Sequence, residues 1–239
     1  MPWRVAGRIA STALAVIATE TIVCTVAAAP VVWSWSQIAQ FSESLGRVGR
    51  VVLCAAAIAP SYVTFALLLM LCSPVATYLT RARTPANVAM RIADFDPMLM
   101  RWARYMAATH IVRVLAGTLF RGTPVWTLYL QLNGARIGHR VYINTTSISD
   151  HNLLAFGDDV VIGADAHVSG HTVERGYVIT GPVHIGHSVT LGLGSVIDID
   201  VTIRDATQVG ALTFIPKHSH LDSHAVYVGI PAAKRVNRA

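Results

Sequence analysis

Four side chains capable of acid–base chemistry lie at two places in the second half of this 239-residue chain. His171 is followed by Glu174 and Arg175, and Asp150 precedes His151. An imidazole can accept a proton from an attacking amine or hydroxyl near neutral pH. We therefore expect His171 to be a catalytic base, with Glu174 orienting it or accepting from a substrate amine, and Arg175 holding an anionic group. Asp150 and His151 form the second catalytic candidate, and the alternative for each histidine is a solvated corner position.

The segment that must position these residues follows a six-residue repeat. Aliphatic residues recur at every sixth position from Ile185 to Leu221, and a small or β-branched residue follows each of them four positions later. This period is typical of a parallel β-helix in which the aliphatic residues point inwards. With interruptions it extends upstream to Ile137. We expect an all-β parallel β-helix over residues 132–228 and a tail over 229–239.

The repeat fails at the two places that carry the candidates. One residue is inserted between the hexads that begin at Ser149 and Phe156, and one is missing between those at Glu174 and Ile179. Departures from local regularity tend to mark functional places. If the Glu174 segment counts as a coil face, the hexads at 149, 168, 185, 203 and 221 share one face. That face then carries a column of histidines: His151, His171, His187 and His224.

Two apolar stretches precede the repeat, Ile9–Trp35 and Val51–Leu79. Each exceeds the ~20 residues that a helix needs to cross a membrane, and the chain is 53% hydrophobic but only 13% charged. We expect an α-helical membrane hairpin within residues 1–83, with its polar turn at 36–50 and the lipid bilayer as its partner. Arginines before the first stretch and after the second favour cytoplasmic ends and a cytoplasmic repeat domain. Arg47 and Arg50 in the turn partly offset this bias.

Residues 84–131 connect the hairpin to the repeat. Asp96 and Pro97 are typical of a helix start, and the residues that follow alternate apolar and aromatic side chains with arginines. Such an amphipathic helix can lie in the membrane interface or pack against the next domain. Anionic lipid headgroups account for arginines beside a span, so we expect no nucleic-acid partner.

The hexads, with the run Gly229-Ile230-Pro231-Ala232-Ala233-Lys234, resemble the hexapeptide-repeat acetyltransferases, such as those acting on serine, maltose and virginiamycin. The resemblance implies a left-handed coil, a homotrimer, and an acetyl-CoA or other acyl-CoA donor whose pantetheine arm lies along the coils. A loop histidine is the base in that family, and His171 matches it by position. We expect cofactor contacts at Gly192, Gly210, Lys217 and Lys234, although one extra alanine precedes Lys234 relative to the family's ending.

A second resemblance covers almost the whole chain and is to the C-terminal modules of the poly-lysine synthetase family of membrane-bound nonribosomal peptide synthetases. It rests on Gly122-Thr123-Pro124, Tyr129 to Gly138, Ile143-Asn144-Thr145-Thr146, Asp150-His151, His171 with Glu174, and Gly181-Pro182-Val183. In that family, pairs of transmembrane helices alternate with acetyltransferase-like domains that join aminoacyl groups presented on a carrier-protein phosphopantetheine. The resemblance implies a separate carrier protein as a partner. We expect substrate contacts at Asn144, Asn152 and Arg175.

Three functions remain open from the sequence. The first is a membrane-anchored acyltransferase that moves an acyl or aminoacyl group from a pantetheine thioester to an amine or hydroxyl. The second is a condensation module that forms peptide or isopeptide bonds with a separate carrier protein, and the third is a non-catalytic β-solenoid scaffold. A zinc site is a further alternative, because hexapeptide β-helices also house carbonic anhydrases. The candidate ligands are His151, His167 and His171. Those enzymes use a pair of histidines five residues apart, whereas His167 and His171 are four residues apart, so we expect no metal.

Overall fold

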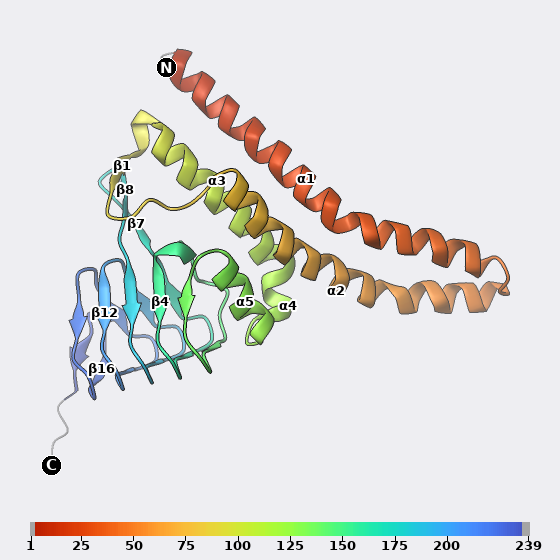
Figure 1. Ribbon diagram of the computed structural model, residues 1–239. Helices are drawn as coiled ribbons and strands as arrows, with labels where there is room; N and C mark the ends of the chain where they lie inside the picture. The colour runs from red at the N-terminus through yellow and green to blue at the C-terminus, as the bar shows by residue number, and fades with distance from the viewer. Residues whose placement is uncertain (1–2, 236–239) are drawn as a thin grey trace.

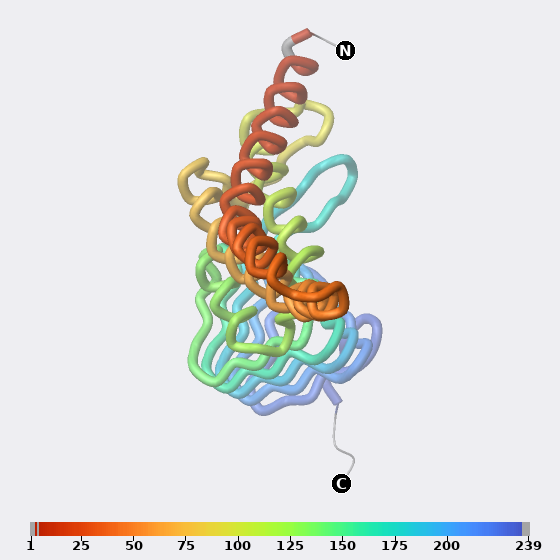
Figure 2. The backbone as a smooth tube through the Cα atoms, turned by 90° about the vertical axis from the view of Figure 1, so that its right-hand side faces the viewer, coloured from red at the N-terminus to blue at the C-terminus, as the bar shows by residue number. Residues whose placement is uncertain are grey.

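The computed structural model describes residues 3–235 and consists of a long helical hairpin, a layer of shorter helices and a coil of β-strands (Figure 1). The hairpin is formed by α1 (Trp3–Ser42) and α2 (Arg47–Leu79). The view in Figure 2 looks along the stack of coils, which lie one behind another beneath the helices. The residues that carry chemistry in the sequence therefore lie in a domain that the layer of shorter helices joins to the hairpin.

Both hairpin helices continue beyond the apolar stretches from which they were predicted, and only residues 43–46 form the turn. Flanking polar residues extend a helix readily once its backbone hydrogen bonds are established. Both helices are long and apolar enough to cross a membrane, and only 11% and 6% of their most apolar windows are buried within the protein. A core helix of a soluble protein would bury far more of its apolar surface.

Four shorter helical segments fill the space between the hairpin and the coil. Asp96 caps α3 (Pro97–Val112) by accepting a hydrogen bond from the Leu99 amide at 2.7 Å, as its type and position predicted. A π-helical segment at Arg113–Gly117, α4 (Thr118–Phe120) and α5 (Pro124–Leu132) follow. α3 contacts α1 and α2, and its Trp102 and Tyr105 side chains lie within hydrogen-bond distance of Asp150 and His151 in the neighbouring domain.

The β domain is built from three parallel sheets that the chain visits in rotation. One sheet contains β2 (Arg136–Ile137), β4 (Leu154–Phe156), β9 (Val183–Ile185), β12 (Val201–Ile203) and β15 (His220–Leu221). The second contains β3 (Tyr142–Ile143), β5 (Val161–Ile162), β10 (Thr190–Leu191), β13 (Gln208–Val209) and β16 (Val226–Val228), with β17 (Ala233–Lys234) antiparallel at its edge. The third contains β6 (His167–Val168), β11 (Val196–Ile197) and β14 (Phe214–Ile215).

The hexad pattern correctly predicted which residues fill the coil. Leu191, Ile197 and Ile215 are fully buried, and so are the small positions Ser195 and Thr207. Gly192 and Gly210 follow aliphatic residues for a steric reason: a Cβ on Gly192 would lie 2.5 Å from the Ala211 amide nitrogen and 2.6 Å from the Gly210 carbonyl carbon. Adjacent coils approach too closely there for any side chain. The left-handed winding stays a prediction.

The predicted stacking of hexads into one histidine face is wrong. Val168 lies beside Ile148 and Ile197, whereas Ile185 lies beside Phe156 and Ile203 in a different sheet. The cause is an antiparallel excursion, β7 (His171–Glu174) and β8 (Tyr177–Thr180), that leaves the coil and pairs with β1 (Ala89–Arg91). Residues in this hairpin form no coil face. His187 and His224 consequently belong to another corner than His171.

Candidate active site

Asp150 and His171 are in direct contact. His171 Nδ1 lies 2.5 Å from Asp150 Oδ2, with the carboxylate fully buried and the His171 side chain 20% exposed. His171 opens β7, and Asp150 precedes a short 3₁₀ turn at His151–Leu153. The two interruptions of the hexad repeat therefore meet at one point of the structure.

The Asp150 carboxylate is held by three hydrogen bonds. Its Oδ1 accepts from Thr84 Oγ1 at 2.6 Å and from Trp102 Nε1 at 3.1 Å, and Oδ2 faces His171. Burial alone would raise the pKa of Asp150, but the bonds from His171, Thr84 and Trp102 outweigh it and lower the pKa below its usual value. The carboxylate is thus ionised and fixed in orientation.

An ionised Asp150 determines which nitrogen of His171 is free to react. It holds the proton of the neutral imidazole on Nδ1, so that Nε2 presents a lone pair. Trp102 packs edge-on against the imidazole, with ring centroids 5.1 Å apart, and Ser169 Oγ lies 3.3 Å from Nδ1. Within residues 3–235, no hydrogen bond occupies His171 Nε2. This is the form and exposure that a general base requires.

The backbone at this contact leaves little room. Asp150 has a φ of 55°, in the left-handed region that Asp tolerates better than most residues. A Cβ on Gly170 would lie 2.8 Å from the Asp150 Cβ and 3.1 Å from the Leu153 Cβ. Gly170 therefore allows the strand that begins at His171 to approach the turn that carries Asp150.

His151 lies behind this pair and is buried. Tyr105 Oη lies 3.1 Å from His151 Nδ1, and His151 Nε2 lies 3.2 Å from the Ile148 carbonyl oxygen, so both ring nitrogens are engaged. The Tyr105 and Tyr129 rings pack edge-on against it. Burial lowers the pKa of His151 to about 4, which keeps the ring neutral at pH 7. These contacts favour a positioning role for His151 rather than proton exchange with a substrate.

We expect stability to fall on acidification because of His151. A histidine of the unfolded chain takes a proton near pH 6.5, whereas the folded pKa of His151 is about 4. Between these values the unfolded state binds more protons, so stability is lost as pH falls, by about 3 kcal/mol in all. Unfolding in detergent can be followed by circular dichroism from about pH 7 to 4. The free energy of unfolding should change less steeply with pH in His151→Asn than in wild type. Equal slopes in wild type, His151→Asn and the exposed control His220→Asn would contradict this.

Glu174 binds Lys217 instead of His171. Lys217 Nζ lies 2.6 and 2.5 Å from the two Glu174 carboxylate oxygens, which ties the projecting hairpin to a later corner of the coil. Asp150, rather than Glu174, orients the imidazole. Arg175 lies at the exposed turn of the hairpin with a φ of 48°.

The remaining predicted binding residues are distributed over the domain. Asn152 makes two hydrogen bonds to the Thr84 backbone: its Nδ2 donates to the Thr84 carbonyl oxygen at 2.9 Å, and its Oδ1 accepts from the Thr84 amide at 3.2 Å. It therefore positions the residue that binds Asp150. Asn144 follows β3 in the second sheet and makes none of these contacts. Lys234 pairs with Asp222 at 3.0 Å on the exposed surface at the far edge of the coil.

The three histidines of the zinc alternative do not converge. His151 uses both nitrogens within the protein, His171 Nδ1 binds Asp150, and His167 is exposed on β6. In the part of the chain that the structure describes, no three His, Cys, Asp or Glu side chains are grouped so as to hold a metal ion.

Sequence reasoning missed Thr84 and Trp102 as site residues. They precede Asp150 by 66 and 48 positions and lie outside the repeat, so no spacing connects them to it. The only available signal was the demand that a buried carboxylate be satisfied by donors. The link that follows the hairpin supplies Thr84, and α3 supplies Trp102.

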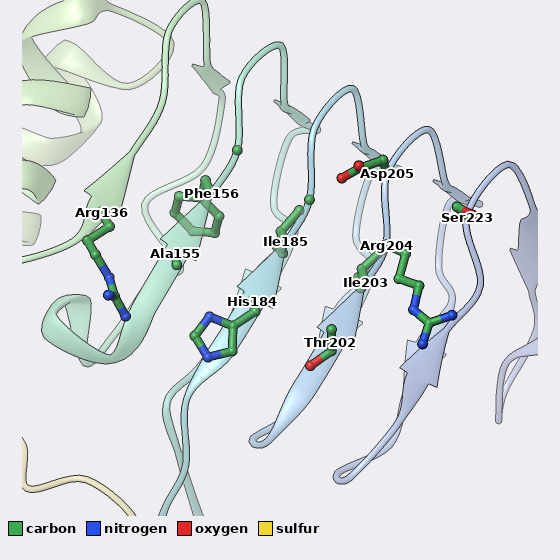
Figure 3. Close-up of a pocket in the computed structure, with 12 residues that line it drawn as sticks. Arg136, Ala155, Phe156, His184, Ile185, Thr202, Ile203, Arg204, Asp205 and Ser223 are labelled. Carbon is green, nitrogen blue, oxygen red and sulfur yellow. The ribbon is translucent and has the colours of Figure 1, made fainter.

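A shallow groove of about 500 Å³ runs over the outer face of the first sheet (Figure 3). Arg136 and His184 project from its strands, Arg204 directly follows β12, and Asp205 and Ser223 lie at its corner. His184 belongs to β9, which the chain enters directly after the hairpin that carries His171. The groove is within the size range of ligand sites.

No family model matches this chain. It is 28% identical to the delta-poly-L-ornithine synthetase of Acinetobacter baumannii (strain AB307-0294) over 135 residues, which is 56% of this chain and 10% of that protein. The chain thus spans about a tenth of the length of the curated relative it matches. This similarity supports the predicted resemblance to a poly-amino-acid synthetase.

Three acyltransferases are among the solved structures that align with part of this chain. A maltose O-acetyltransferase from Clostridium difficile 630 aligns with a TM-score of 0.44 at 16% identity, covering 62% of this chain and 91% of that chain. A hexapeptide-repeat acetyltransferase from Vibrio cholerae O1 biovar eltor, complexed with acetyl coenzyme A, aligns with a TM-score of 0.38 at 23% identity. The alignment covers 42% of this chain and 58% of that chain. An N-acyltransferase from Bacillus cereus, in complex with dTDP and 3-hydroxybutyryl-CoA, aligns with a TM-score of 0.34 at 21% identity. The alignment covers 45% of this chain and 68% of that chain. These alignments cover only part of this chain.

Proposed function

We propose that this chain is a membrane-anchored acyltransferase that moves an aminoacyl or acyl group from a pantetheine thioester to an amine, with His171 as general base. The observation that carries the proposal is the contact between buried Asp150 and partly exposed His171. It orients the imidazole and leaves Nε2 for the acceptor. The two apolar helices hold the domain at the bilayer.

The reaction requires one proton to be moved twice. As the acceptor amine nitrogen attacks the thioester carbon, His171 Nε2 takes a proton from it, and Asp150 stabilises the resulting imidazolium. Collapse of the tetrahedral intermediate breaks the carbon–sulfur bond. The imidazolium then protonates the departing thiolate, so that an amide and a free thiol are the products.

The groove on the first sheet is the proposed path for the pantetheine donor. One of its lining residues, His184, follows the His171 hairpin by four positions, and Arg136 and Arg204 offer cations to the donor's phosphate. Coenzyme A and a carrier protein share this phosphopantetheine arm. We also propose a homotrimer, in which the coils of a neighbouring subunit cover the groove.

The curated relative favours an amino acid as the transferred group and as the acceptor. Its name describes a polymer of ornithine joined through the δ-amine. A primary amine that attacks an aminoacyl thioester would form the corresponding isopeptide bond. This chain would then act as a condensation module with a separate carrier protein.

Thioester turnover by the purified chain tests the proposal. Ornithinyl and lysyl thioesters on a carrier-protein phosphopantetheine are compared with acetyl-CoA, each with free ornithine or lysine as acceptor, and thiol release and product mass are measured. Turnover of the aminoacyl carrier supports condensation, and turnover of acetyl-CoA alone identifies an acetyltransferase instead. If no thioester is bound or consumed, the chain is a scaffold and the proposal fails.

Glu174→Gln is expected to lower turnover less than tenfold, far less than a change at His171. Glu174 is already paired with Lys217, and this half-exposed pair contributes up to about 1 kcal/mol to stability. The measurement is turnover beside Lys217→Gln, which breaks the same pair from the other side. A loss of a hundredfold or more in Glu174→Gln, with Lys217→Gln unaffected, would instead make Glu174 catalytic.

A further inference from the structure

An arginine-rich hollow of about 590 Å³ lies where the hairpin meets the rest of the protein. It is formed by the end of α2, the link that follows it, and α3. Its lining consists of Tyr78, Leu79, Arg81, Arg83, Thr84, Pro85 and Arg101. The proposed reaction uses none of these arginines.

The three arginines of the hollow have no carboxylate partner among residues 3–235, and all three are exposed. Three arginines elsewhere are paired with carboxylates: Arg91 with Asp94, Arg121 with Asp165 and Arg140 with Asp159. Arg83 lies over the Tyr78 ring, with its guanidinium carbon 5.7 Å from the centroid. Three uncompensated guanidinium groups around one hollow create a site for an anion, and guanidinium matches phosphate geometry in particular.

One wall of the hollow is apolar. Tyr78 and Leu79 are 68% and 73% exposed, although they end a helix apolar enough to span a membrane. Arginines immediately beyond such a helix lie at the depth of lipid headgroups. A ligand with phosphate next to an apolar chain matches this pairing of surfaces, whereas free phosphate would use only the arginines.

We infer that the hollow formed by Tyr78, Leu79, Arg81, Arg83 and Arg101 binds the phosphate headgroup of an anionic membrane phospholipid. The inference rests on the membrane placement of the hairpin in the proposed function. Thr84, which lines the hollow, also donates to Asp150, and Arg101 precedes Trp102, the other donor to that carboxylate. A bound headgroup would therefore order the link that fixes the catalytic pair.

Lipid retention by the full-length chain tests the inference. Protein from nanodiscs containing equal amounts of phosphatidylglycerol and phosphatidylcholine is transferred to a delipidating detergent, and the retained lipid is counted by native mass spectrometry. Wild type should retain phosphatidylglycerol over phosphatidylcholine, and the triple variant Arg81→Gln, Arg83→Gln, Arg101→Gln should lose this preference by about tenfold or more. The matched control Arg91→Gln, Arg121→Gln, Arg140→Gln removes as many charges from paired positions and should keep the preference.

Three outcomes would overturn the inference: equal retention of both lipids by wild type, an equal loss in the control triple, or complete displacement of lipid by millimolar inorganic phosphate. The last would identify a free-anion site. Retention is read without any thioester, so a failure here leaves the proposed reaction standing. Conversely, loss of turnover in a chain that retains lipid would defeat only the reaction.

Discussion

Replacing His171 by asparagine is expected to reduce thioester turnover by about 10²- to 10⁴-fold while the protein stays folded. Asparagine can place an amide N–H near the position of Nδ1, so the hydrogen bond to buried Asp150 is kept and only the basic Nε2 is lost. His171→Ala should lose as much activity. It should also be less stable, because it leaves a buried carboxylate with one donor fewer.

The chain contains a matched control for this experiment. His218 Nδ1 lies 2.7 Å from an Asp200 carboxylate oxygen, but this pair is exposed: the His218 side chain is 63% exposed and that of Asp200 is 50% exposed. His218→Asn should therefore leave turnover unchanged. Retention of turnover within tenfold in folded His171→Asn would remove His171 from the catalytic role, and equal losses in both variants would point to a general effect of the substitution.

Asp150→Asn should be nearly as damaging, although Asp150 touches no substrate. The asparagine amide can accept from Thr84 and Trp102 through its oxygen, but its NH₂ group then faces His171 Nδ1. Nδ1 must become an acceptor, which moves the imidazole proton to Nε2 and removes the lone pair that the reaction needs. We expect kcat to fall by about 10²- to 10⁴-fold with KM little changed.

The split between kcat and KM separates this positioning role from a role in substrate binding. A destabilised protein would lose active molecules, which circular dichroism and the unfolding midpoint would reveal. Asp200→Asn provides the equivalent change at the exposed pair and should alter neither constant. A rise in KM with kcat preserved in Asp150→Asn would mean that Asp150 acts in binding instead.

The repeat domain was predictable because its rule is local. Each hexad has an inward aliphatic residue and a small residue, and burial of Leu191, Ile197 and Ser195 follows from that pattern. The two breaks in the pattern also marked the residues that come together, Asp150 and His171. The hairpin helices followed from length and hydropathy alone, and so did the end of α2 at Leu79, although the other three helix ends did not.

The tertiary structure decided the roles within the site. The shared histidine face required the Glu174 segment to be one face of the coil. In the structure β7 pairs with β8, and β8 pairs with β1, a strand far earlier in the chain, so residues 171–180 form a projecting hairpin instead. That rearrangement separates Glu174 from the imidazole and gives it to Lys217. Asp150, in place of Glu174, is then the carboxylate that orients the imidazole, and both nitrogens of the neighbouring His151 are used within the core.

The sequence by itself determined the two apolar helices, the inward-facing hexads and the positions where the repeat breaks, since each depends on residues close together in the chain. The structure alone revealed that Thr84 and Trp102 complete the site. A buried carboxylate must find donors wherever the fold places them, and here it finds them on the helix link and on α3, 66 and 48 residues earlier. Contacts between such distant residues depend on how the helical layer packs on the coil, which no local spacing encodes.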